Sequence, residues 1–434
     1  MRLFGTSGIR GVVDGNLVSL AFKIGMAVGK VYGNVVLGSD TRTSGDVMKH
    51  ALISGLLADG SRCDDIGIAP TPTLAFATRE CDAGVMITAL HNPPEYNGIK
   101  LWNPDGSSFD SAQQRQIEDT VSSDSLNVVP WDKMKQSSIL NGAIAQHIER
   151  IRQNFPDKLG VKVVVDAGCG AASLVTPCLL KELGCEVLTL DCYPSGFFPR
   201  GIEPVESNLG ILIRTTLDSG ADLGITHDGD AGRMMAVDDK GRFISGDRLL
   251  VILARAVGAR EVVTTVDASM AIEEMDFKVR LTRVGDTAVS EELKEKGGDF
   301  GGEPSGGWIF PSVSFCPDGI YAAAQIAAVA GQRKLSELVD SIPCYPLLRG
   351  SVNSQGVAIS SLELRLMTLE PLSVDNLDGI KLNFKDGWLL VRASGTEPKV
   401  RLTAEAKSEA RVRELYDNGL KAIQDCVALK ESVG

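Results

Sequence analysis

Residues 226–233, THDGDAGR, place two carboxylates where they could act together. Asp228 and Asp230 alternate along a loop that follows an apolar segment. Alternate carboxylates on a glycine-containing loop can point at one hard cation, and Mg²⁺ prefers oxygen ligands. Two carboxylates do not complete such a site, and an acidic turn facing solvent is the structural alternative. Metal binding at this loop is therefore one hypothesis of two.

Two further loops carry groups that suit a sugar and a phosphate. Residues 301–307, GGEPSGG, present the carboxylate of Glu303 and the hydroxyl of Ser305, which can hydrogen-bond to sugar hydroxyls. A plain glycine-rich turn is the alternative. Residues 392–398, RASGTEP, combine the guanidinium of Arg392 with hydroxyls and freed backbone N–H groups, a suitable phosphate cradle. The alternative here is a turn with a surface arginine.

A fourth loop, MITALHNPPEYNGIK at 86–100, follows a short apolar strand and ends in Lys100. Polar loops of this kind often carry chemistry on a rigid scaffold. Its centre, however, is Leu90, which offers no reactive group. Lys100 and Arg10, in GTSGIRG, could add positive charge to a phosphate site. A solvated lysine and a surface salt bridge are the alternatives.

The elements that position these loops repeat along the chain. Three segments, at 35–40, 163–168 and 262–267, each contain a β-branched run that leads to an aspartate (Asp40, Asp166 or Asp267), followed by small residues and a helical pattern. Strand, polar turn and helix in this order indicate βαβ units, and continuous apolar strands are typical of sheets covered on both faces. We predict three related α/β domains, although any large α/β protein offers three such strands.

The last part of the chain has a different pattern. Residues 380–384 alternate, 386–387 are a turn signal and 388–391 form a second run, which predicts a hairpin before a charged helix at 408–430. The fold class is therefore three related α/β domains in tandem followed by a smaller α+β domain. The predicted domains are 1–145 with the candidate active-site loop (86–100), 146–250 with the metal-type loop (226–233), 251–345 with the sugar loop (301–307) and 346–434 with the phosphate loop (392–398).

Composition narrows the class of protein. At 434 residues the chain is too long for one core, and 44% hydrophobic with 23% charged residues is ordinary for a globular protein. A net charge of −12 argues against nucleic acid as a partner, and no apolar run reaches membrane-spanning length. Nine scattered cysteines without C-x-x-C spacing and an N-terminus lacking a signal-peptide core predict a cytoplasmic protein with reduced thiols and no zinc.

Taken in order, the loops resemble the α-D-phosphohexomutase family, which includes phosphoglucomutase, phosphomannomutase and phosphoglucosamine mutase. The resemblance covers the whole chain and implies the same four-domain architecture. The segments that carry it are FGTSGIRG, GSDTRTSGD (38–46), IAPTP (68–72), TALHNPPEYNGIK, IEPVESNL (202–209), HDGDAGR, GGEPSGG and RASGTEPKVR.

The resemblance implies a reaction in which a phosphoserine gives its phosphoryl group to a hexose phosphate. The sugar bisphosphate turns over in the cleft and returns its other phosphoryl group, while Mg²⁺ is held by three aspartates and the serine phosphate. The implied catalytic positions are Leu90, His91, Lys100 and Arg10. The implied substrate-binding residues are Glu303, Ser305, Arg233, Arg392, Ser394, Gly395 and Thr396.

The chain departs from the family pattern at the groups that transfer phosphoryl. Leu90 occupies the position of the phosphorylated serine and has no hydroxyl, so it cannot form a phosphoenzyme. Gly232 replaces the third aspartate beside Asp228 and Asp230, which predicts a weak or absent Mg²⁺ site. Gly307 ends the sugar loop, where many members have a histidine.

Three hypotheses remain open from the sequence. The first is a hexose phosphate-binding protein without turnover, partnered by an active paralogue or a second copy of itself. The second is an active mutase using Thr88, or using a bound hexose bisphosphate as activator and donor with Lys100 as acid and base. The third is a slow phosphatase or phosphotransferase. The sequence does not distinguish glucose, mannose and glucosamine phosphates.

Overall fold

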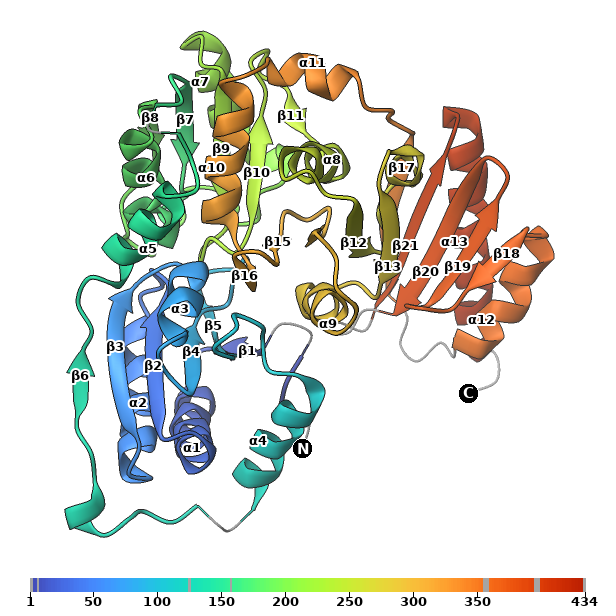
Figure 1. Cartoon of the computed structure of the whole chain (residues 1–434). Helices are drawn as coiled ribbons and strands as arrows, with labels where there is room; N and C mark the ends of the chain where they lie inside the picture. The colour runs from blue at the N-terminus through green and yellow to red at the C-terminus, as the bar shows by residue number, and fades with distance from the viewer. Residues whose placement is uncertain are drawn as a thin grey trace.

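The computed structural model describes residues 3–5, 8–123, 126–156, 158–353, 359–393 and 399–431, without the side chains of 359–361 and 427–431. The described residues form four sheets, each built from a consecutive part of the chain (Figure 1). The first three share one arrangement, which confirms three related α/β domains. Only the fourth is antiparallel throughout, as predicted for a different final domain.

The repeat is visible in the strand order. The three β-branched runs become β2, β7 and β12, and each is the central strand of a parallel triplet: β4-β2-β3, β9-β7-β8 and β14-β12-β13. In each domain the chain then leaves the first strand of its triplet through a loop and returns as an antiparallel strand, β5, β10 or β15. Equivalent loops in the three domains therefore follow β4, β9 and β14.

In the first domain the sheet order is β1-β5-β4-β2-β3-β6. Helices α1 and α2 pack closely because both carry glycine at their crossing: a Cβ on Gly25 would lie 2.2 Å from the Leu52 oxygen. The elements are β1 (Ile9–Val12), α1 (Gly15–Val31), β2 (Asn34–Ser39), α2 (Gly45–Ala58), β3 (Arg62–Ile68), α3 (Thr71–Thr78), β4 (Ala83–Ile87), β5 (Tyr96–Trp102), α4 (Ser111–Ser122), η1 (Trp131–Lys133) and β6 (Ser137–Ile139).

In the second domain the sheet order is β11-β10-β9-β7-β8. The elements are α5 (Ala143–Arg152), β7 (Lys162–Asp166), η2 (Ala171–Leu174), α6 (Thr176–Glu182), β8 (Glu186–Leu190), η3 (Glu206–Asn208), α7 (Gly210–Asp218), β9 (Leu223–His227), β10 (Met234–Val237) and β11 (Phe243–Ile244).

In the third domain the sheet order is β13-β12-β14-β15-β16. The elements are α8 (Gly246–Ala256), β12 (Glu261–Thr265), η4 (Met270–Glu274), β13 (Lys278–Thr282), α9 (Asp286–Lys296), β14 (Phe300–Gly302), β15 (Trp308–Phe310), β16 (Ser314–Pro317), α10 (Gly319–Ala330) and α11 (Leu335–Asp340).

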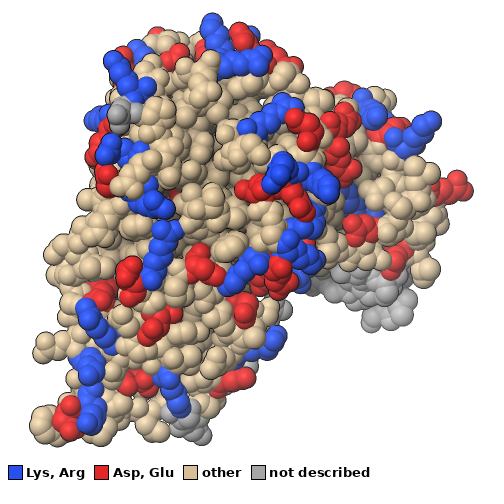
Figure 2. All heavy atoms as spheres, viewed as in Figure 1, with Lys and Arg blue, Asp and Glu red and all other residues tan. Residues whose placement is uncertain are grey.

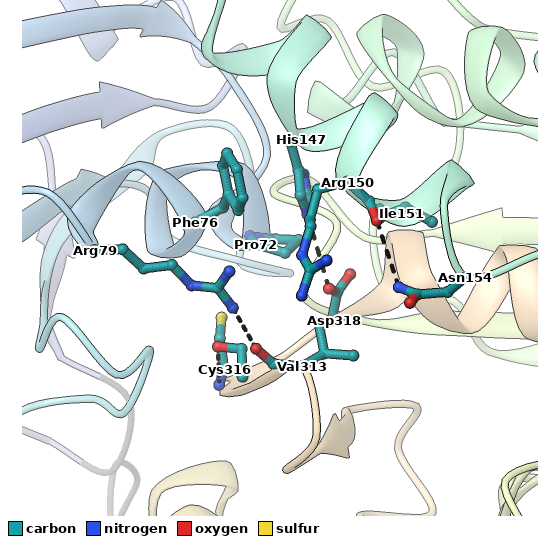
Figure 3. A pocket seen from close by; sticks show the side chains of 11 residues that line it. Pro72, Phe76, Arg79, His147, Arg150, Ile151, Asn154, Val313, Cys316 and Asp318 are labelled. Atoms are coloured by element: carbon teal, nitrogen blue, oxygen red, sulfur yellow. Dashed lines mark hydrogen bonds and ion pairs between the residues drawn. The ribbon is translucent and has the colours of Figure 1, made fainter.

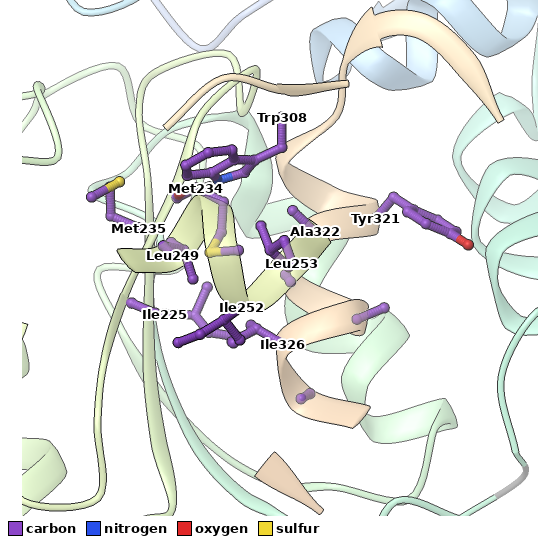
Figure 4. Close-up of a cluster of buried hydrophobic side chains, with 14 of the residues drawn as sticks. Ile225, Met234, Met235, Leu249, Ile252, Leu253, Trp308, Tyr321, Ala322 and Ile326 are labelled. Carbon is purple, nitrogen blue, oxygen red and sulfur yellow. Dashed lines mark hydrogen bonds between the residues drawn. The ribbon is translucent and has the colours of Figure 1, made fainter. Parts of the chain in front are cut away.

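One hydrophobic core joins the second and third domains. Met234 on β10 and Trp308 on β15 lie in the same buried cluster as Ile326 on α10, as the close-up of that cluster shows (Figure 4). The Trp308 indole N–H donates to the Met234 carbonyl at 2.7 Å. Since β10 and β15 lead directly out of the metal-type and sugar loops, this core fixes those two loops relative to each other.

In the fourth domain the sheet order is β17-β21-β20-β19-β18, and the predicted hairpin is confirmed by the antiparallel pair β19 and β20. The charged helix is confirmed as α13. The elements are β17 (Leu347–Asn353), α12 (Ile359–Leu366), η5 (Met367–Leu369), β18 (Ser373–Asp375), β19 (Ile380–Phe384), β20 (Gly387–Ala393), β21 (Lys399–Ala406) and α13 (Glu409–Glu431).

The surface agrees with the charge pattern of the sequence. On the face drawn in Figure 2, basic and acidic side chains are interspersed, and no broad basic tract covers one domain. Within the described part of the chain, no helix has both the length and the apolar composition needed to cross a membrane.

Candidate functional site

The three equivalent loops meet in one pocket between the first three domains. Its lining comes from the loops after β4, β9 and β14, together with β5, the end of β16 and the first residues of α3 and α9. The lining residues are Thr71, Leu90, Lys100, Trp102, Asp230, Gly232, Arg233, Asp286, Glu303, Gly307 and Pro317. The pocket therefore brings together Leu90, which the resemblance placed at the nucleophile position, the metal-type loop and the sugar loop.

Leu90 stands at the tip of the loop after β4 with a left-handed backbone, φ +54°. A non-glycine residue in this region costs about 1–2 kcal/mol and is seen mostly where function or surrounding structure requires it. Its carbonyl lies so near Gly229 that a Cβ there would come within 2.8 Å of the oxygen. Leucine thus occupies a strained loop tip that faces the metal-type loop.

Arg42 holds this loop in place from beneath. Its guanidinium donates to the carbonyls of Pro93 and Asn92 at 2.6 Å each, Tyr96 at 2.9 Å and Leu90 at 3.1 Å. Its Nε pairs with the buried carboxylate of Asp40 at 3.1 Å. A planar guanidinium can serve several acceptors at once, so one side chain fixes the whole turn.

Thr88 is committed to the same network. Its hydroxyl donates to Asp40 Oδ2 at 2.7 Å and accepts the Leu90 N–H at 2.9 Å, and its side chain is buried. Burial raises the pKa of Asp40 to about 6, although Arg42 and Thr88 oppose that shift. For Thr88 to carry a phosphoryl group, both hydrogen bonds would have to break and the loop would have to move.

The metal-type loop holds two buried carboxylates, of which Asp230 lines the pocket and Asp228 lies behind it. Asp230 Oδ2 accepts from the Thr71 hydroxyl at 2.5 Å, and Asp228 Oδ1 accepts from the Arg233 N–H at 3.1 Å. Asp228 Oδ2 is buried without a hydrogen-bond partner among the described residues, 3.9 Å from Arg233 Nε. Burial and the neighbouring Asp230 raise the pKa of Asp228 above its usual range.

This donor set fits a divalent cation only in part. An unpartnered buried oxygen beside a second carboxylate is the environment in which a cation offsets repulsion. Gly232 supplies no oxygen from a side chain, and the described residues contain no cluster of three or more His, Cys, Asp or Glu arranged for a metal. Asp228 and Asp230 would hold Mg²⁺ with other oxygens completing its shell.

The sugar end of the pocket is built by the third domain and by β5. Glu303 accepts from the Gly285 N–H at 2.9 Å, and burial, with the nearby Asp286, raises the pKa of Glu303 to about 7. Lys100 pairs with Asp286 at 2.5 Å and lies 4.5 Å from the centre of the Trp102 ring. The Trp102 indole N–H has no acceptor among the described residues, so it is a free donor on the lining.

The predicted basic residues and His91 surround the loop tip. Arg10 donates to the Asn92 side chain at 2.8 Å, and Arg233 pairs with Glu203 at 3.4 Å. Burial, followed by the charges of Arg233 and Arg10, lowers the pKa of His91 to about 2. His91 is therefore neutral near pH 7 and can donate or accept one hydrogen bond but cannot act there as a cationic acid.

Not every predicted residue lies on the pocket. Ser305 is exposed at the turn after Glu303 and is not part of the lining. Arg392, on β20 of the fourth domain, pairs with Asp378 at 3.5 Å, and Asp378 accepts the Val284 N–H at 3.0 Å. The remaining predicted phosphate ligands, Ser394, Gly395 and Thr396, lie outside the described residues.

A second, smaller hollow lies where α3, α5 and β16 meet (Figure 3). His147 is stacked on Phe76, lies 3.0 Å from the Thr73 hydroxyl and 4.0 Å from Asp318. Burial lowers the pKa of His147 to about 3, and the hollow contains none of the site residues predicted from sequence. Its contacts join three domains rather than the chemistry-bearing loops.

Six residues of the site were missed by the sequence reasoning: Asp40, Arg42, Thr71, Trp102, Asp286 and Pro317. Asp40 and Arg42 lie in GSDTRTSGD and Thr71 lies in IAPTP, so the motifs contained them without indicating their contacts. Asp286 stands in no quoted motif, and its pairing with Lys100 across 186 positions left no signal in the sequence.

Comparison with known proteins accounts for this arrangement. Models of phosphoglucomutase/phosphomannomutase alpha/beta/alpha domains I, II and III match residues 1–127, 144–241 and 245–345, and the model of the C-terminal domain matches 357–420. The chain belongs to the phosphoglucomutase/phosphomannomutase family. The four matches follow one another in order and carry every loop of the pocket.

Relatives and solved structures extend the match over the full length. A "probable phosphoglucosamine mutase" of Methanocella arvoryzae is 45% identical over 98% of this chain and 99% of its own. A phosphoglucomutase/phosphomannomutase family protein of Burkholderia thailandensis superimposes with a TM-score of 0.87 at 27% identity, covering 98% and 97% of the chains. The N-acetylphosphoglucosamine mutase of Aspergillus fumigatus, solved with GlcNAc-6P and magnesium, shares the fold with a TM-score of 0.63 at 16% identity, covering 98% and 96%.

Proposed function

We propose that this family member binds hexose phosphates, hexosamine phosphates in particular, without forming a phosphoenzyme. The observation that carries the proposal is Leu90 itself. It occupies the tip of a loop that Arg42 and Thr88 still hold in a strained conformation, facing Asp230 and Lys100. The framework for a nucleophile is present, and the side chain that fills it has no oxygen to phosphorylate.

Binding is supported by the groups that remain around the pocket. Glu303 can exchange hydrogen bonds with sugar hydroxyls, and its raised pKa lets it act as donor or acceptor near neutral pH. Arg10 and Arg233 carry positive charge at the loop tip, and Arg392 is assigned to the distal phosphate. Charge-assisted hydrogen bonds of this kind recognise phosphate without any transfer of it.

A hexosamine is favoured over other hexoses because several full-length relatives at 45–46% identity are named as probable phosphoglucosamine mutases. Mg²⁺ held by Asp228 and Asp230 would supply positive charge beside a bound phosphate. Since one ligand position is Gly232, we expect this binding to be weak and the sugar phosphate to bind without it.

The 45–46% identity to probable phosphoglucosamine mutases also favours a second candidate, an active mutase that uses a modified route. In that case a hexose bisphosphate would donate its phosphoryl group directly to the hexose phosphate. Lys100 would be the available acid and base, but its ammonium group is engaged by Asp286 at 2.5 Å. Turnover by this route requires that ion pair to open.

A paired experiment separates the candidates. Hexose phosphate binding is measured by calorimetry, and mutase turnover is measured in a coupled assay with Mg²⁺ and a trace of hexose bisphosphate, for wild type and Leu90→Ser/Gly232→Asp. A Cβ on Gly232 would meet only Asp230 Oδ1 at 3.5 Å, an ordinary contact, so the backbone at this position accepts a side chain. We expect wild type to bind without turnover and the double variant to turn over. Turnover by wild type at the rate of the double variant would reject the proposal.

A further inference from the structure

The pocket contains a carboxylate for which the phosphoryl reaction gives no role. Asp286 is the first residue of α9, and its side chain is 12% exposed on the pocket lining. Oδ1 accepts the Thr287 N–H at 2.9 Å, and Oδ2 faces Lys100 Nζ at 2.5 Å. Gly285, beside it, donates its N–H to Glu303, so Asp286 and Glu303 adjoin at the sugar end.

These two carboxylates differ in charge near neutral pH. Burial raises the pKa of Glu303 to about 7, so a large part of it is protonated. Burial acts in the same direction on Asp286, but Lys100 outweighs it and the pKa of Asp286 is lowered. At the sugar end, Asp286 is therefore the carboxylate that stays ionised near neutral pH. The third carboxylate of the lining, Asp230, belongs to the metal-type loop.

A carboxylate accepts hydrogen bonds from the hydroxyls of any hexose, but with an ammonium group both partners of the hydrogen bond carry charge. Asp286 therefore best matches a sugar that carries an ammonium group. Lys100 has a second partner within reach, the face of Trp102 at 4.5 Å, which can hold its ammonium group when the carboxylate is shared. Asp286 can therefore accept a second cation without leaving Lys100 unpartnered.

We propose that Asp286 selects 2-amino-2-deoxyhexose phosphates, its carboxylate accepting a hydrogen bond from the ammonium group of the sugar. This inference rests on the proposed hexose phosphate binding and adds the residue that sets the sugar class. Glu303 then reads hydroxyls that all hexoses share, and Asp286 reads the one group in which a hexosamine differs.

A purely structural role for the Lys100–Asp286 pair has a control in the chain, a more exposed ion pair between the same two domains. Lys294 pairs with Asp105 at 2.6 Å and joins the same two domains, yet neither residue lines the pocket. Asp105→Asn therefore removes an ion pair between the first and third domains without touching the site. Asp286→Asn removes the other pair together with the proposed contact to the sugar.

The test is calorimetric binding of glucosamine 6-phosphate, N-acetylglucosamine 6-phosphate and glucose 6-phosphate to wild type, D286N and D105N. We expect wild type to prefer glucosamine 6-phosphate at least about tenfold, the effect of one charge-assisted hydrogen bond. D286N should lose that preference, because its affinity for glucosamine 6-phosphate should fall by more than its affinity for glucose 6-phosphate, and D105N should keep the preference.

Three results would overturn the inference while leaving hexose phosphate binding intact: a wild type without preference, a D286N that keeps it, or a D105N that loses it equally. The wild-type comparison of the charged and acetylated amines needs no variant, so the inference stays testable if D286N does not fold. Failure of wild type to bind any of the three ligands would instead reject the proposed function.

Discussion

Replacing Arg42 by methionine should release the loop that carries Leu90. The guanidinium makes four hydrogen bonds to the carbonyls of that loop and an ion pair with Asp40, and both side chains of the pair are fully buried. Methionine fills much of the same volume but donates nothing. The substitution leaves an uncompensated carboxylate and several carbonyls in a protein interior.

The magnitude follows from the burial. Breaking a buried ion pair by removing one partner costs about 3–5 kcal/mol, and most of the lost carbonyl bonds can be replaced by water once the loop opens. We therefore expect the free energy of opening of the loop to fall by about 3–5 kcal/mol in R42M. Arg42→Lys keeps a positive charge beside Asp40 but lacks the forked guanidinium that donates to several carbonyls. We therefore expect it to lower the free energy of loop opening by about half as much as R42M does.

Hydrogen exchange of the peptide 86–100, read by mass spectrometry, measures this opening directly and avoids the assumption that a four-domain protein unfolds in one step. Arg152→Met is the control, because Arg152 pairs with Glu149 on the surface, where such pairs contribute about 0–1 kcal/mol. The difference in opening free energy between wild type and R42M should become smaller from about pH 8 to about pH 5. Over this range Asp40, whose pKa is raised to about 6 by burial, becomes protonated and no longer needs a cation.

Protection of 86–100 in R42M that equals wild type would refute the reasoning. It would mean that the loop is held by its own backbone and by Thr88 rather than by Arg42. A defect of the same size at both pH values would leave the loop argument standing but contradict the role given to the Asp40 charge.

Three further outcomes are expected. The pKa of Glu303, raised from 4.5 to about 7 by burial, makes its contribution to stability complete below pH 4.5 and lost as pH rises through 7. Over that window the free energy of opening of the segment that carries Glu303, read by hydrogen exchange, should fall by about 3 kcal/mol more in wild type than in Glu303→Gln. Hexose phosphate should raise the melting temperature through linkage, and Arg392→Ala should remove most of that shift; an unchanged shift would reject the phosphate assignment. Gly229→Ala should lower the unfolding free energy by about 1–3 kcal/mol, because its Cβ would meet the Leu90 carbonyl at 2.8 Å, and a neutral effect would show that the loop yields freely.

The sequence predicted the architecture well because each domain is organised by one buried strand. The runs that became β2, β7 and β12 share a buried aliphatic centre and end at the polar positions where the chain turns, so the hydrophobic pattern and the turn signals indicate the same boundaries. The hairpin of β19 and β20 was equally readable, since alternation and an Asp-Gly turn occur together.

The site was predictable only as a set of loops. That the loops after β4, β9 and β14 meet follows from the way three repeats pack around a shared centre, and spacing along the chain does not encode that packing. Arg42 acts by donating hydrogen bonds to backbone carbonyls. Because every residue has a backbone carbonyl, the residue types of the loop do not reveal which of them accept from Arg42. In the sequence, Asp286 is indistinguishable from an ordinary acidic residue at the start of a helix. Its place in the site follows only from its ion pair with Lys100, which is far away along the chain.

The central claim is that the chain keeps the loop of a phosphoryl carrier and lacks the carrier. The direct measurement is the intact mass of the protein after incubation with a hexose bisphosphate and Mg²⁺, for wild type and Leu90→Ser. Our account predicts an unchanged mass for wild type and the gain of one phosphoryl group for the serine variant, located by peptide mapping at position 90. A stoichiometric phosphoryl group on wild type would contradict the account, and the peptide that carried it would identify the true nucleophile.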